Sequence, residues 1–418
     1  MAPDYDLIIV GAGMVGSALA SALQNSRLRV AMLDAQALPD NAPEPTTASG
    51  FDSRVSALSA ASENLLRHLG AWQRLPADSA FAYQQMQVWD AEGTGQISFT
   101  AAALSEPRLG HIVENRHVQH ALHASIDASR VTLLGGRRVI TLVREEAVWR
   151  LNLETGESLR APLIIAADGA RSPVRELAGM ATREWDYLHH AIVTTVETAA
   201  AHEATAWQRF LPTGPLAFLP LPPRNGRHYC SIVWSLLPDA ADAVMALDEA
   251  AFCEALGEAF ELRLGRVLAA DPRQRIALRQ RHAKTYVMPG LALIGDAAHS
   301  IHPLAGQGVN LGFLDAAVIA DVLLKASSRG ESLAELAVLQ RYERQRMANN
   351  LAMMAAMEGF QRLFHADALP LRWLRNAGMN LVDQHSLIKG RLMRQAMGLQ
   401  GDLPPLARDP ALAAEAGY

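Results

Sequence analysis

Short apolar runs that end in glycine or an acid recur along this chain, and each is followed by a helical pattern. The first run is YDLIIV, which leads into Gly11-x-Gly13-x-x-Gly16 and then into the small and apolar residues of a helix. A second run, LRVAMLD, ends at Asp34. Uninterrupted apolar runs of this length are typical of strands buried on both faces of a parallel sheet. The alternation of strand and helix therefore predicts an α/β fold.

The glycine spacing at the first strand end indicates a dinucleotide site. Gly11 permits the tight turn, Gly13 lets the backbone approach a pyrophosphate, and Gly16 lets the helix pack on the strand. The helix N-terminus offers free N–H groups to phosphates. Asp34 lies 18 residues after Gly16, where a carboxylate can accept hydrogen bonds from ribose hydroxyls. A glycine-rich turn in an ordinary α/β sheet is the competing interpretation, and the complete strand, helix and acid make it less favoured.

Two later strands end in the same manner. The run from Leu163 to Ala167 ends in Asp168-Gly169, and SPVREL then starts a helix with Ser172 as N-cap. The run from Leu291 to Ile294 ends in Gly295 and Asp296. Parallel sheets bind ligands at the carboxyl ends of their strands, and Asp296 is placed to accept from a ribitol hydroxyl.

A glycine-rich loop follows the third of these strands. Gly306, Gln307 and Gly308 leave the backbone free beside a helix that begins near Asn310. A helix N-terminus stabilises negative charge, such as that on a reduced flavin. Together the three strand ends predict FAD as the cofactor, held in a Rossmann-like domain.

Two stretches break the alternation of strand and helix. Residues 81–100 and 182–277 contain runs such as AIVTTVET and HYCSIVWSL, which predict antiparallel strands over the flavin. Four aromatic side chains in these stretches either line a pocket beneath that sheet or belong to the core, and for each one the core is favoured: Trp207, Phe210, Phe218 and Trp234.

Composition narrows the class of protein. The chain has 418 residues, of which 50% are hydrophobic, so more than one domain is expected. A net charge of −5 gives no reason to expect a nucleic-acid partner. Cys230 and Cys253 do not form a CxxC pair, and no apolar run reaches the roughly 18 residues that a transmembrane helix needs. We therefore expect a soluble cytoplasmic protein.

Several motifs resemble a known family. The three strand ends in this order are similar to FAD-dependent aromatic hydroxylases with the p-hydroxybenzoate hydroxylase fold. The stretches SRVSALSAASENLLRHLG, LGHIVENRHVQHAL and GDAAHSIHPLAGQGVNLGF resemble the UbiH/UbiF/VisC hydroxylases of ubiquinone biosynthesis. WDYLHHA and FLPTGPLAFLPL look most like the VisC branch, the 2-polyprenylphenol 6-hydroxylases.

The resemblance implies a domain organisation. The chain would have an FAD-binding domain built from residues 1–80, 101–181 and 278–350. An antiparallel-sheet substrate domain of residues 81–100 and 182–277 is interleaved with it, and residues 351–418 form a helical C-terminal segment.

The resemblance also implies an activity and a set of cofactor contacts. The enzyme would hydroxylate the ring of a polyprenylated phenol with O₂, through a flavin C4a-hydroperoxide. Arg54 would approach the flavin, and Asn115 or the neighbouring Arg116 would contact the cofactor. The implied contacts are Gly11, Gly13, Gly16, Asp34, Arg54, Asn115, Asp168, Gly295, Asp296, Pro303, Gly306, Gln307, Gly308 and Asn310, with Pro303, Gly306, Gln307 and Gly308 on the flavin side.

Other activities stay open. A related hydroxylase could act at another ring position or on another aromatic substrate. A prenyl reductase or halogenase would keep FAD and change the reaction, and a non-catalytic FAD-bound subunit of a ubiquinone-biosynthesis complex would lack turnover. The chain contains no second dinucleotide fingerprint, so NAD(P)H would bind transiently or a partner would deliver electrons. The sequence leaves the oligomeric state open.

The histidines and the C-terminal segment each have two interpretations. His299 and His302 have a spacing that suggests a metal, but without a carboxylate partner hydrogen bonding to loop backbone is favoured, and His189 and His190 are interpreted likewise. The segment 371–394 carries a net charge of +4. It predicts either a helical pair that caps the FAD domain or a contact with an anionic membrane surface at the inner face of the membrane, and the cap is slightly favoured.

Overall fold

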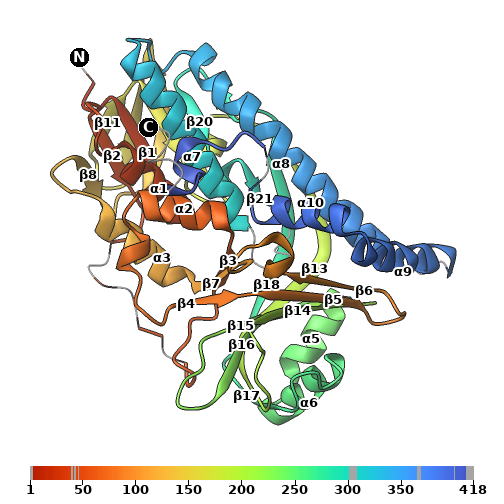
Figure 1. The fold of residues 1–418 in the computed structure, drawn as a ribbon. Coiled ribbons are helices and arrows are strands. Elements are labelled where there is room, and N and C mark those ends of the chain that lie inside the picture. The colour runs from red at the N-terminus through yellow and green to blue at the C-terminus, as the bar shows by residue number, and fades with distance from the viewer. Residues whose placement is uncertain are drawn as a thin grey trace.

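A six-stranded sheet forms the centre of one half of this computed structural model (Figure 1). The structure describes residues 3–38, 41, 44–45, 47–300, 308–364, 369–399 and 401–410, and the side chains of 187, 357, 360–364 and 369–375 are not described. The sheet has the order β19-β20-β12-β1-β2-β8, and every neighbouring pair except β19–β20 is parallel. Its strands are β1 (Leu7–Val10), β2 (Val30–Leu33), β8 (Val131–Leu134), β12 (Leu163–Ala166), β19 (Val287–Met288) and β20 (Leu291–Leu293). The predicted α/β class is confirmed.

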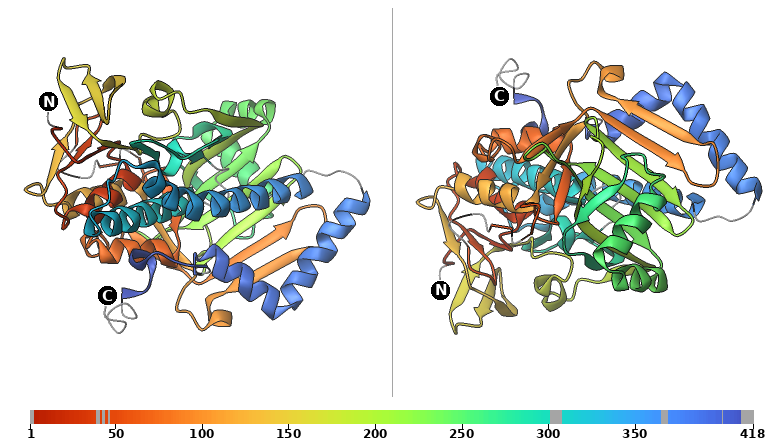
Figure 2. Two further views of the ribbon diagram at one scale, coloured as in Figure 1. Left: turned by 90° about the horizontal axis from the view of Figure 1, so that it is seen from above. Right: turned by 90° about the horizontal axis from the view of Figure 1, so that it is seen from below.

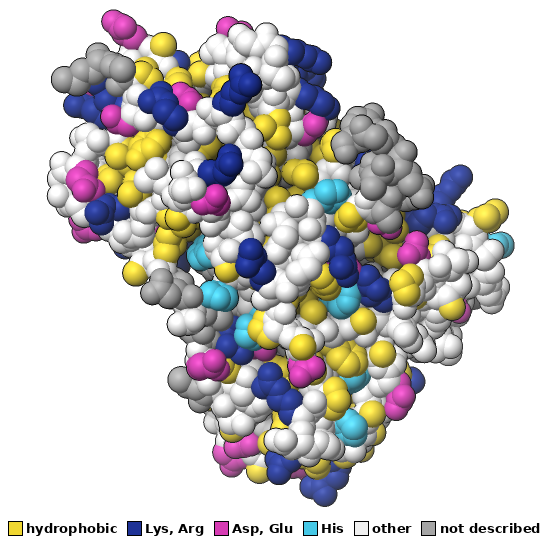
Figure 3. Space-filling model, turned by 60° about the vertical axis from the view of Figure 1, so that its left-hand side comes forward, with side chains coloured by type: hydrophobic (Ala, Val, Ile, Leu, Met, Phe, Trp, Pro, Cys, Tyr) yellow, Lys and Arg dark blue, Asp and Glu magenta, His cyan; other side chains and the backbone are white. Residues whose placement is uncertain are grey.

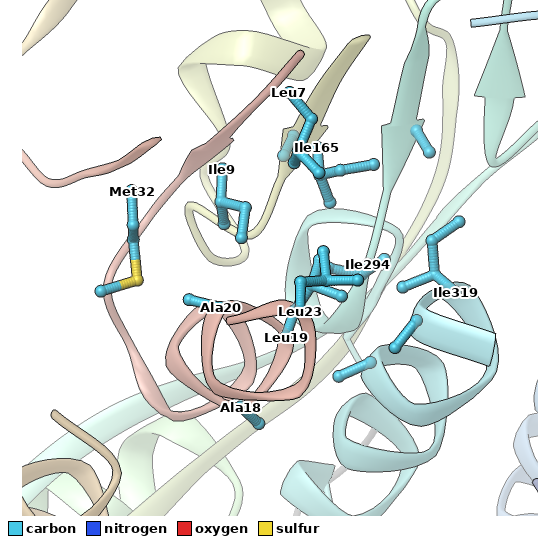
Figure 4. Close-up of a cluster of buried hydrophobic side chains, with 14 of the residues drawn as sticks. Leu7, Ile9, Ala18, Leu19, Ala20, Leu23, Met32, Ile165, Ile294 and Ile319 are labelled. Carbon is cyan, nitrogen blue, oxygen red and sulfur yellow. The ribbon is translucent and has the colours of Figure 1, made fainter. Parts of the chain in front are cut away.

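Helices and the small sheet β9–β10–β11 pack against this sheet and bury its strands, which explains why its central strands read as unbroken apolar runs. All four residues of β1, of β2 and of β12 are buried. Figure 4 shows Leu7 and Ile165 of neighbouring strands packed with Leu19 and Leu23 of α1 and with Ile319 of α7. The helices of this half are α1 (Met14–Leu23), α2 (Ala60–His68), α3 (Asn115–Ser125), α4 (Pro173–Leu177) and α7 (Gly308–Ser328).

Two small sheets flank this core. β3 (Val55–Leu58), β7 (Gly110–Glu114) and β4 (Ala80–Tyr83) form one antiparallel sheet in that order. β9 (Val139–Glu145), β10 (Val148–Leu153) and β11 (Ser158–Ala161) form the other.

A nine-stranded sheet makes up the other half of the molecule. Its order is β21-β18-β13-β16-β15-β14-β5-β6, and β17 pairs with β13 beside this path. The pairs are antiparallel apart from β5 with β14. The strands are β5 (Gln85–Asp90), β6 (Gln96–Thr100), β13 (Thr182–Thr198), β14 (Thr205–Leu211), β15 (Gly214–Pro220), β16 (His228–Leu236), β17 (Val267–Ala270), β18 (Gln274–Ala283) and β21 (His299–Ser300).

One face of this sheet packs against two helices, α5 (Pro238–Ala246) and α6 (Glu249–Ala259). Strand residues alternate between the faces, so Ile232 and Trp234 of β16 pack toward α6 while Ser231 and Val233 point the other way. Trp207, Phe218 and Trp234 all belong to the cluster under these helices.

The pocket interpretation of the four aromatic residues is therefore wrong, and the core interpretation is confirmed. The fourth, Phe210, packs with Val88 and with Met379 of a C-terminal helix. The physical reason is that both faces of this sheet are apolar, so alternation alone does not tell which face meets the cavity.

The predicted C-terminal segment, residues 351–418, contains the second half of α8 (Leu336–Phe364), followed by α9 (Leu369–Gln384) and α10 (Ser386–Ala396). Figure 2 shows α9 lying along the strand hairpin β5–β6, at the edge of the large sheet. Its polar side chains accept hydrogen bonds from the edge strand: Asn376 from Gly95 N–H at 2.5 Å and Asp383 from Ser98 N–H at 3.0 Å. The helix thereby satisfies edge groups that would otherwise be open to another strand.

One face of the molecule is mixed in charge. Figure 3 shows this face, on which basic and acidic side chains are interspersed. None of the helices in the described part of the chain is long and apolar enough to cross a membrane.

Candidate active site

The turn between β1 and α1 brings backbone against backbone. Gly11 has φ +109°, and a Cβ there would lie 2.4 Å from the carbonyl oxygen of Ala167. A Cβ at Gly16 would lie 1.9 Å from the carbonyl oxygen of Gly11, so α1 packs on the strand only because this residue is glycine. Gly13 differs, because nothing lies within 4 Å of its Cβ position. It faces open space at the helix N-terminus.

Asp34 follows the second strand and closes the same turn. Its Oδ2 accepts a hydrogen bond from the N–H of Ala12 at 2.8 Å, and its Oδ1 accepts from the N–H of Gln36 at 2.8 Å. The carboxylate therefore lies beside the glycine turn, in a groove of about 790 Å³. The charged side chains that line this groove are Asp34, Asp168, Arg54, Arg116, Arg137, Arg138 and Arg171. The excess of arginine suits a ligand with phosphate groups.

Asp168 stands at the end of β12, also in the groove. Its Oδ2 accepts from the N–H of Val174 at 3.0 Å, at the N-terminus of α4. Its Oδ1 is buried and has no hydrogen-bond partner within the described residues. Burial raises the pKa of this carboxyl, and the neighbouring Ser172 side chain and the N–H of Val174 oppose this rise. A buried acceptor without a partner is what a missing ligand hydroxyl would satisfy.

The end of the third strand, β20, is fixed by a hydrogen bond to the buried carboxylate of Asp315. Gly295 has φ +57°, and its N–H donates to Oδ2 of Asp315 on α7 at 3.0 Å. Close packing with Val15 leaves no room for a side chain at Gly312. Asp296, the next residue, is exposed and lines the cavity. The enclosing protein raises the pKa of Asp296, and His299 and Arg54 oppose this rise.

A cavity of about 440 Å³ lies between this loop and the nine-stranded sheet. It is continuous with the groove, because Gly13, Arg54, Ala167 and Gly169 line both. Its sheet side is mostly aliphatic: it is lined by Ala191, Val193, Leu219, Val233, Ile276, Ala277 and Leu278, with Ser231, Arg279 and Ser300 as the polar residues. The groove and the cavity together form one elongated site, polar at the Asp34 end and apolar beneath the sheet.

Asn115 and Arg116 point to different parts of this site. Asn115 lines the cavity, and its Oδ1 accepts from Ser56 Oγ at 2.6 Å. Arg116 lines the groove, where its Nε lies 2.9 Å from Oε2 of Glu114. Arg54 lies where the two spaces join.

The remaining predicted residues fall into two groups. Gly308 lines the cavity at the start of α7. The Asn310 side chain instead binds protein groups: its Oδ1 accepts from Ser59 N–H at 3.0 Å and Ser62 Oγ at 2.7 Å. Pro303, Gly306 and Gln307 lie outside the described residues, as does His302.

His299 differs from the expected loop histidine. Its Nε2 lies 2.5 Å from Oδ2 of Asp315, so the partner is a buried carboxylate rather than backbone. His189 is buried as well. Within the described ranges no group of three or more His, Cys, Asp or Glu side chains could hold a metal ion.

Asp315 and Arg346 were missed by reasoning from sequence. Asp315 is the one acid between Leu311 and Ala320, on an otherwise apolar helix face, and this was the available signal. Its Oδ1 accepts from Arg346 Nε at 2.7 Å, 31 residues away on α8. His299 and Arg346 outweigh burial and hold the pKa of Asp315 at about 2.

The site fits FAD in shape and in chemistry. The open position at Gly13 beside the N-terminus of α1 leaves room for a pyrophosphate, and Asp34 lies where a ribose would follow. The unpartnered Asp168 Oδ1 and the cavity-facing Asp296 offer acceptors between the groove and the cavity.

Comparisons with known proteins agree with this fit. Residues 4–356 match the family model described as FAD binding domain. The chain is 39% identical over 398 residues to 3-demethoxyubiquinol 3-hydroxylase of Escherichia coli, covering 94% of this chain and 98% of that protein. It is 36% identical to the ubiquinone hydroxylase UbiL of Rhodospirillum rubrum, with 94% and 89% of the two chains covered. It is 33% identical to the human ubiquinone biosynthesis monooxygenase COQ6, with 93% and 92% covered.

Solved structures show the same fold. p-Nitrophenol 4-monooxygenase PnpA of Pseudomonas putida superimposes with a TM-score of 0.76 at 20% identity, over 96% of this chain and 99% of that one. PqsL of Pseudomonas aeruginosa gives 0.73 at 21% identity, over 90% and 99%. With the family model and the relatives above, the site places this chain in the family of FAD-dependent monooxygenases that includes the ubiquinone hydroxylases.

Proposed function

We propose that this enzyme hydroxylates the aromatic ring of a polyprenylated phenol in ubiquinone biosynthesis. The observation that carries the proposal is the junction of the cofactor groove with a cavity roofed by aliphatic side chains. The names of the relatives from Escherichia coli, Rhodospirillum rubrum and human support the same substrate class.

FAD, when bound, supplies the redox chemistry that activates O₂ for transfer of one oxygen atom to the ring. Gly11, Gly13, Gly16 and Asp34 hold its ADP half, and Arg54, Asn115, Asp168, Gly295 and Asp296 hold the part toward the cavity. Gly308 and the backbone at Asn310 complete the proposed site, together with Pro303, Gly306 and Gln307.

The protein's own contribution is to orient the ring and exclude water. Ala191, Val193 and Val233 cover the cavity without presenting a charge. Such a roof suits the hydrocarbon part of a lipid and keeps out water that would divert the reaction into peroxide release.

The domain division is part of this proposal. Residues 1–80, 101–181 and 278–350 bind FAD, and 81–100 with 182–277 cover the substrate. The junction predicted at residue 277 falls inside β18. This strand reaches from the large sheet to the loop that carries Asp296, because its end pairs with β21.

A peripheral membrane contact through α10 fits a lipid substrate. This helix exposes Leu387, Ile388 and Leu392 beside Arg391 and Arg394. Apolar side chains flanked by arginine are typical of helices that lie on anionic membranes.

We also propose NAD(P)H or a partner reductase as the electron source.

The decisive experiment is mass spectrometry of quinone intermediates in a host that lacks this gene. We expect a polyprenylated intermediate to accumulate and the gene to restore ubiquinone. Accumulation of the polyprenylphenol itself, before a second ring oxygen is added, would assign position 6, as the VisC-like motifs imply. Accumulation of demethoxyubiquinol would assign the step named for the Escherichia coli relative. An unchanged quinone pool in a host without a paralogue would contradict the proposal. A second measurement, substrate-dependent oxygen uptake by the purified protein, distinguishes an enzyme from a non-catalytic subunit.

A further inference from the structure

Ser231 is a buried hydroxyl-bearing residue on the mostly aliphatic sheet side of the cavity, where Arg279 of β18 and Ser300 of β21 are the other polar residues. Ser231 of β16 pairs across the strands with Leu219 and lies two residues before Val233, and all three line the cavity. The side chain is fully buried, and within the described parts of the chain its Oγ has no hydrogen-bond partner.

The strand register sets which way this hydroxyl points. Cys230 and Ile232, on either side of it, belong to the cluster under α5 and α6 on the opposite face. Thr195 of β13 is its cross-strand neighbour, and its buried Oγ1 also has no partner in the described residues. Thr195 lines a different hollow, however, so of these two hydroxyl-bearing residues Ser231 is the one that lines the cavity with Asp296.

A buried hydroxyl without a partner costs free energy comparable to a lost hydrogen bond. An alanine would leave the roof fully aliphatic at this position. The hydroxyl is both donor and acceptor, so it can satisfy a phenolic or a methoxy oxygen of a ring that enters the cavity.

We infer that Ser231 is a specificity-determining residue, and that its Oγ hydrogen-bonds an oxygen substituent on the aromatic ring of the substrate. The inference rests on the proposed function and deepens it. The aliphatic part of the roof accepts any hydrocarbon, and the buried hydroxyl of Ser231 within it distinguishes an oxygen-bearing ring and fixes its rotation. A site built to hydrogen-bond a hydroxyl discriminates strongly against an analogue that lacks it.

The test compares two ligands that differ by one oxygen, 2-geranylphenol and geranylbenzene. Each is titrated into the purified FAD-bound protein, and binding is followed through the absorbance of the oxidised flavin, without turnover. We expect the wild type to bind 2-geranylphenol about tenfold more tightly than geranylbenzene. Ser231→Ala is expected to lower this preference about five- to tenfold while FAD affinity stays unchanged.

Ser235→Ala is the matched control. Ser235 is buried on the same strand and the same face, but it does not line the cavity. We expect it to keep the wild-type preference. Because Ser231 loses no partner, Ser231→Ala should unfold thermally no earlier than Ser235→Ala.

Three results would overturn the inference: no binding of 2-geranylphenol, an unchanged preference in Ser231→Ala, or a lower unfolding temperature than the control. The first would show that the cavity does not take such a ring, and the third that the hydroxyl already has a partner. Failure of the quinone complementation with an intact Ser231 effect would instead reject the biosynthetic role and leave the ring recognition standing.

Discussion

Arg346 of α8 and Asp315 of α7 form a buried ion pair, with 2.7 Å between Nε and Oδ1. The other oxygen of Asp315 accepts from Gly295 N–H and from His299. One carboxylate therefore connects two helices to the loop that presents Asp296 to the cavity. The charges are taken out of water, and the energy of the arrangement depends on every partner being present.

Arg346→Met should destabilise the protein by about 3–5 kcal/mol, because Asp315 keeps its charge and loses a buried partner. Urea unfolding of the FAD-bound protein measures this loss. Arg341→Met is the matched control on the same helix, since the Arg341–Glu331 pair is partly exposed. It should cost about 0–1 kcal/mol. Equal losses in the two variants would contradict the role given to the buried pair.

Gly13→Ala and Gly16→Ala should separate cofactor binding from folding. A Cβ at Gly13 meets nothing within 4 Å, so the FAD-free variant should unfold within about 2 °C of the wild type. Its methyl group would occupy the space proposed for the pyrophosphate, which should raise the FAD dissociation constant about tenfold or more. Thermal unfolding and quenching of flavin fluorescence measure the two quantities.

Gly16→Ala should both lower the unfolding temperature and weaken FAD binding, because its Cβ would overlap the carbonyl oxygen of Gly11 and displace α1. If Gly13→Ala bound FAD as tightly as the wild type, the groove would not hold the pyrophosphate at this point.

The parts of the site that sequence reasoning reached are those built from consecutive residues. The spacing of Gly11, Gly13 and Gly16 reports a turn and a helix start, which are local properties of the backbone. Partners far apart in the chain were not reachable. Asp315 meets Arg346 only because two helices pack, and Ser231 faces the cavity only because α5 and α6 cover the other face of its strand. Two apolar faces carry no sequence signal that tells which of them meets a ligand.

Asp296→Ala should weaken FAD binding about 10- to 100-fold, the range expected for loss of a hydrogen bond to a charged group. The variant removes a carboxylate that lines the cavity, and among the described residues only the backbone oxygen of Asp296 accepts a hydrogen bond, from Ser300 Oγ. Flavin occupancy after purification and a titration with FAD provide the measurement. Asp321→Ala is the control, because Asp321 lies on α7 and pairs with Lys325 at the surface. Normal flavin affinity in Asp296→Ala would remove this residue from the proposed site.

Replacing Leu387, Ile388 and Leu392 together with serine should lower binding to vesicles that contain anionic lipid. Leu387 is 81% exposed, so its contribution to the core is small. The control replaces Leu237, Leu262 and Leu268, which are exposed in the other half of the molecule. Vesicle flotation of wild type and both variants gives the result. Equal flotation of all three proteins would reject a membrane contact through α10.

Glu63 makes stability depend on pH in a defined window. Its carboxylate lies 2.6 Å from guanidinium nitrogens of Arg67 and Arg108, and 3.2 Å from His111 Nδ1. Burial raises the pKa of Glu63, but these partners outweigh burial and lower it from 4.5 to about 2. The folded state therefore binds this proton less readily than the unfolded chain does.

The ion pairs of Glu63 stabilise the folded state fully above pH 4.5. This contribution to the free energy of unfolding is lost as pH falls toward about 2. Urea midpoints measured across this window should fall less steeply in Glu63→Gln than in the wild type, although the variant is less stable at pH 7. Glu154→Gln, which removes an exposed carboxylate paired with Arg138, should keep the wild-type slope. The same slope in Glu63→Gln and wild type would mean that acid unfolding begins at other carboxylates. The next variants would then replace Glu114 and Asp315, because the pKa of each is lowered to about 2.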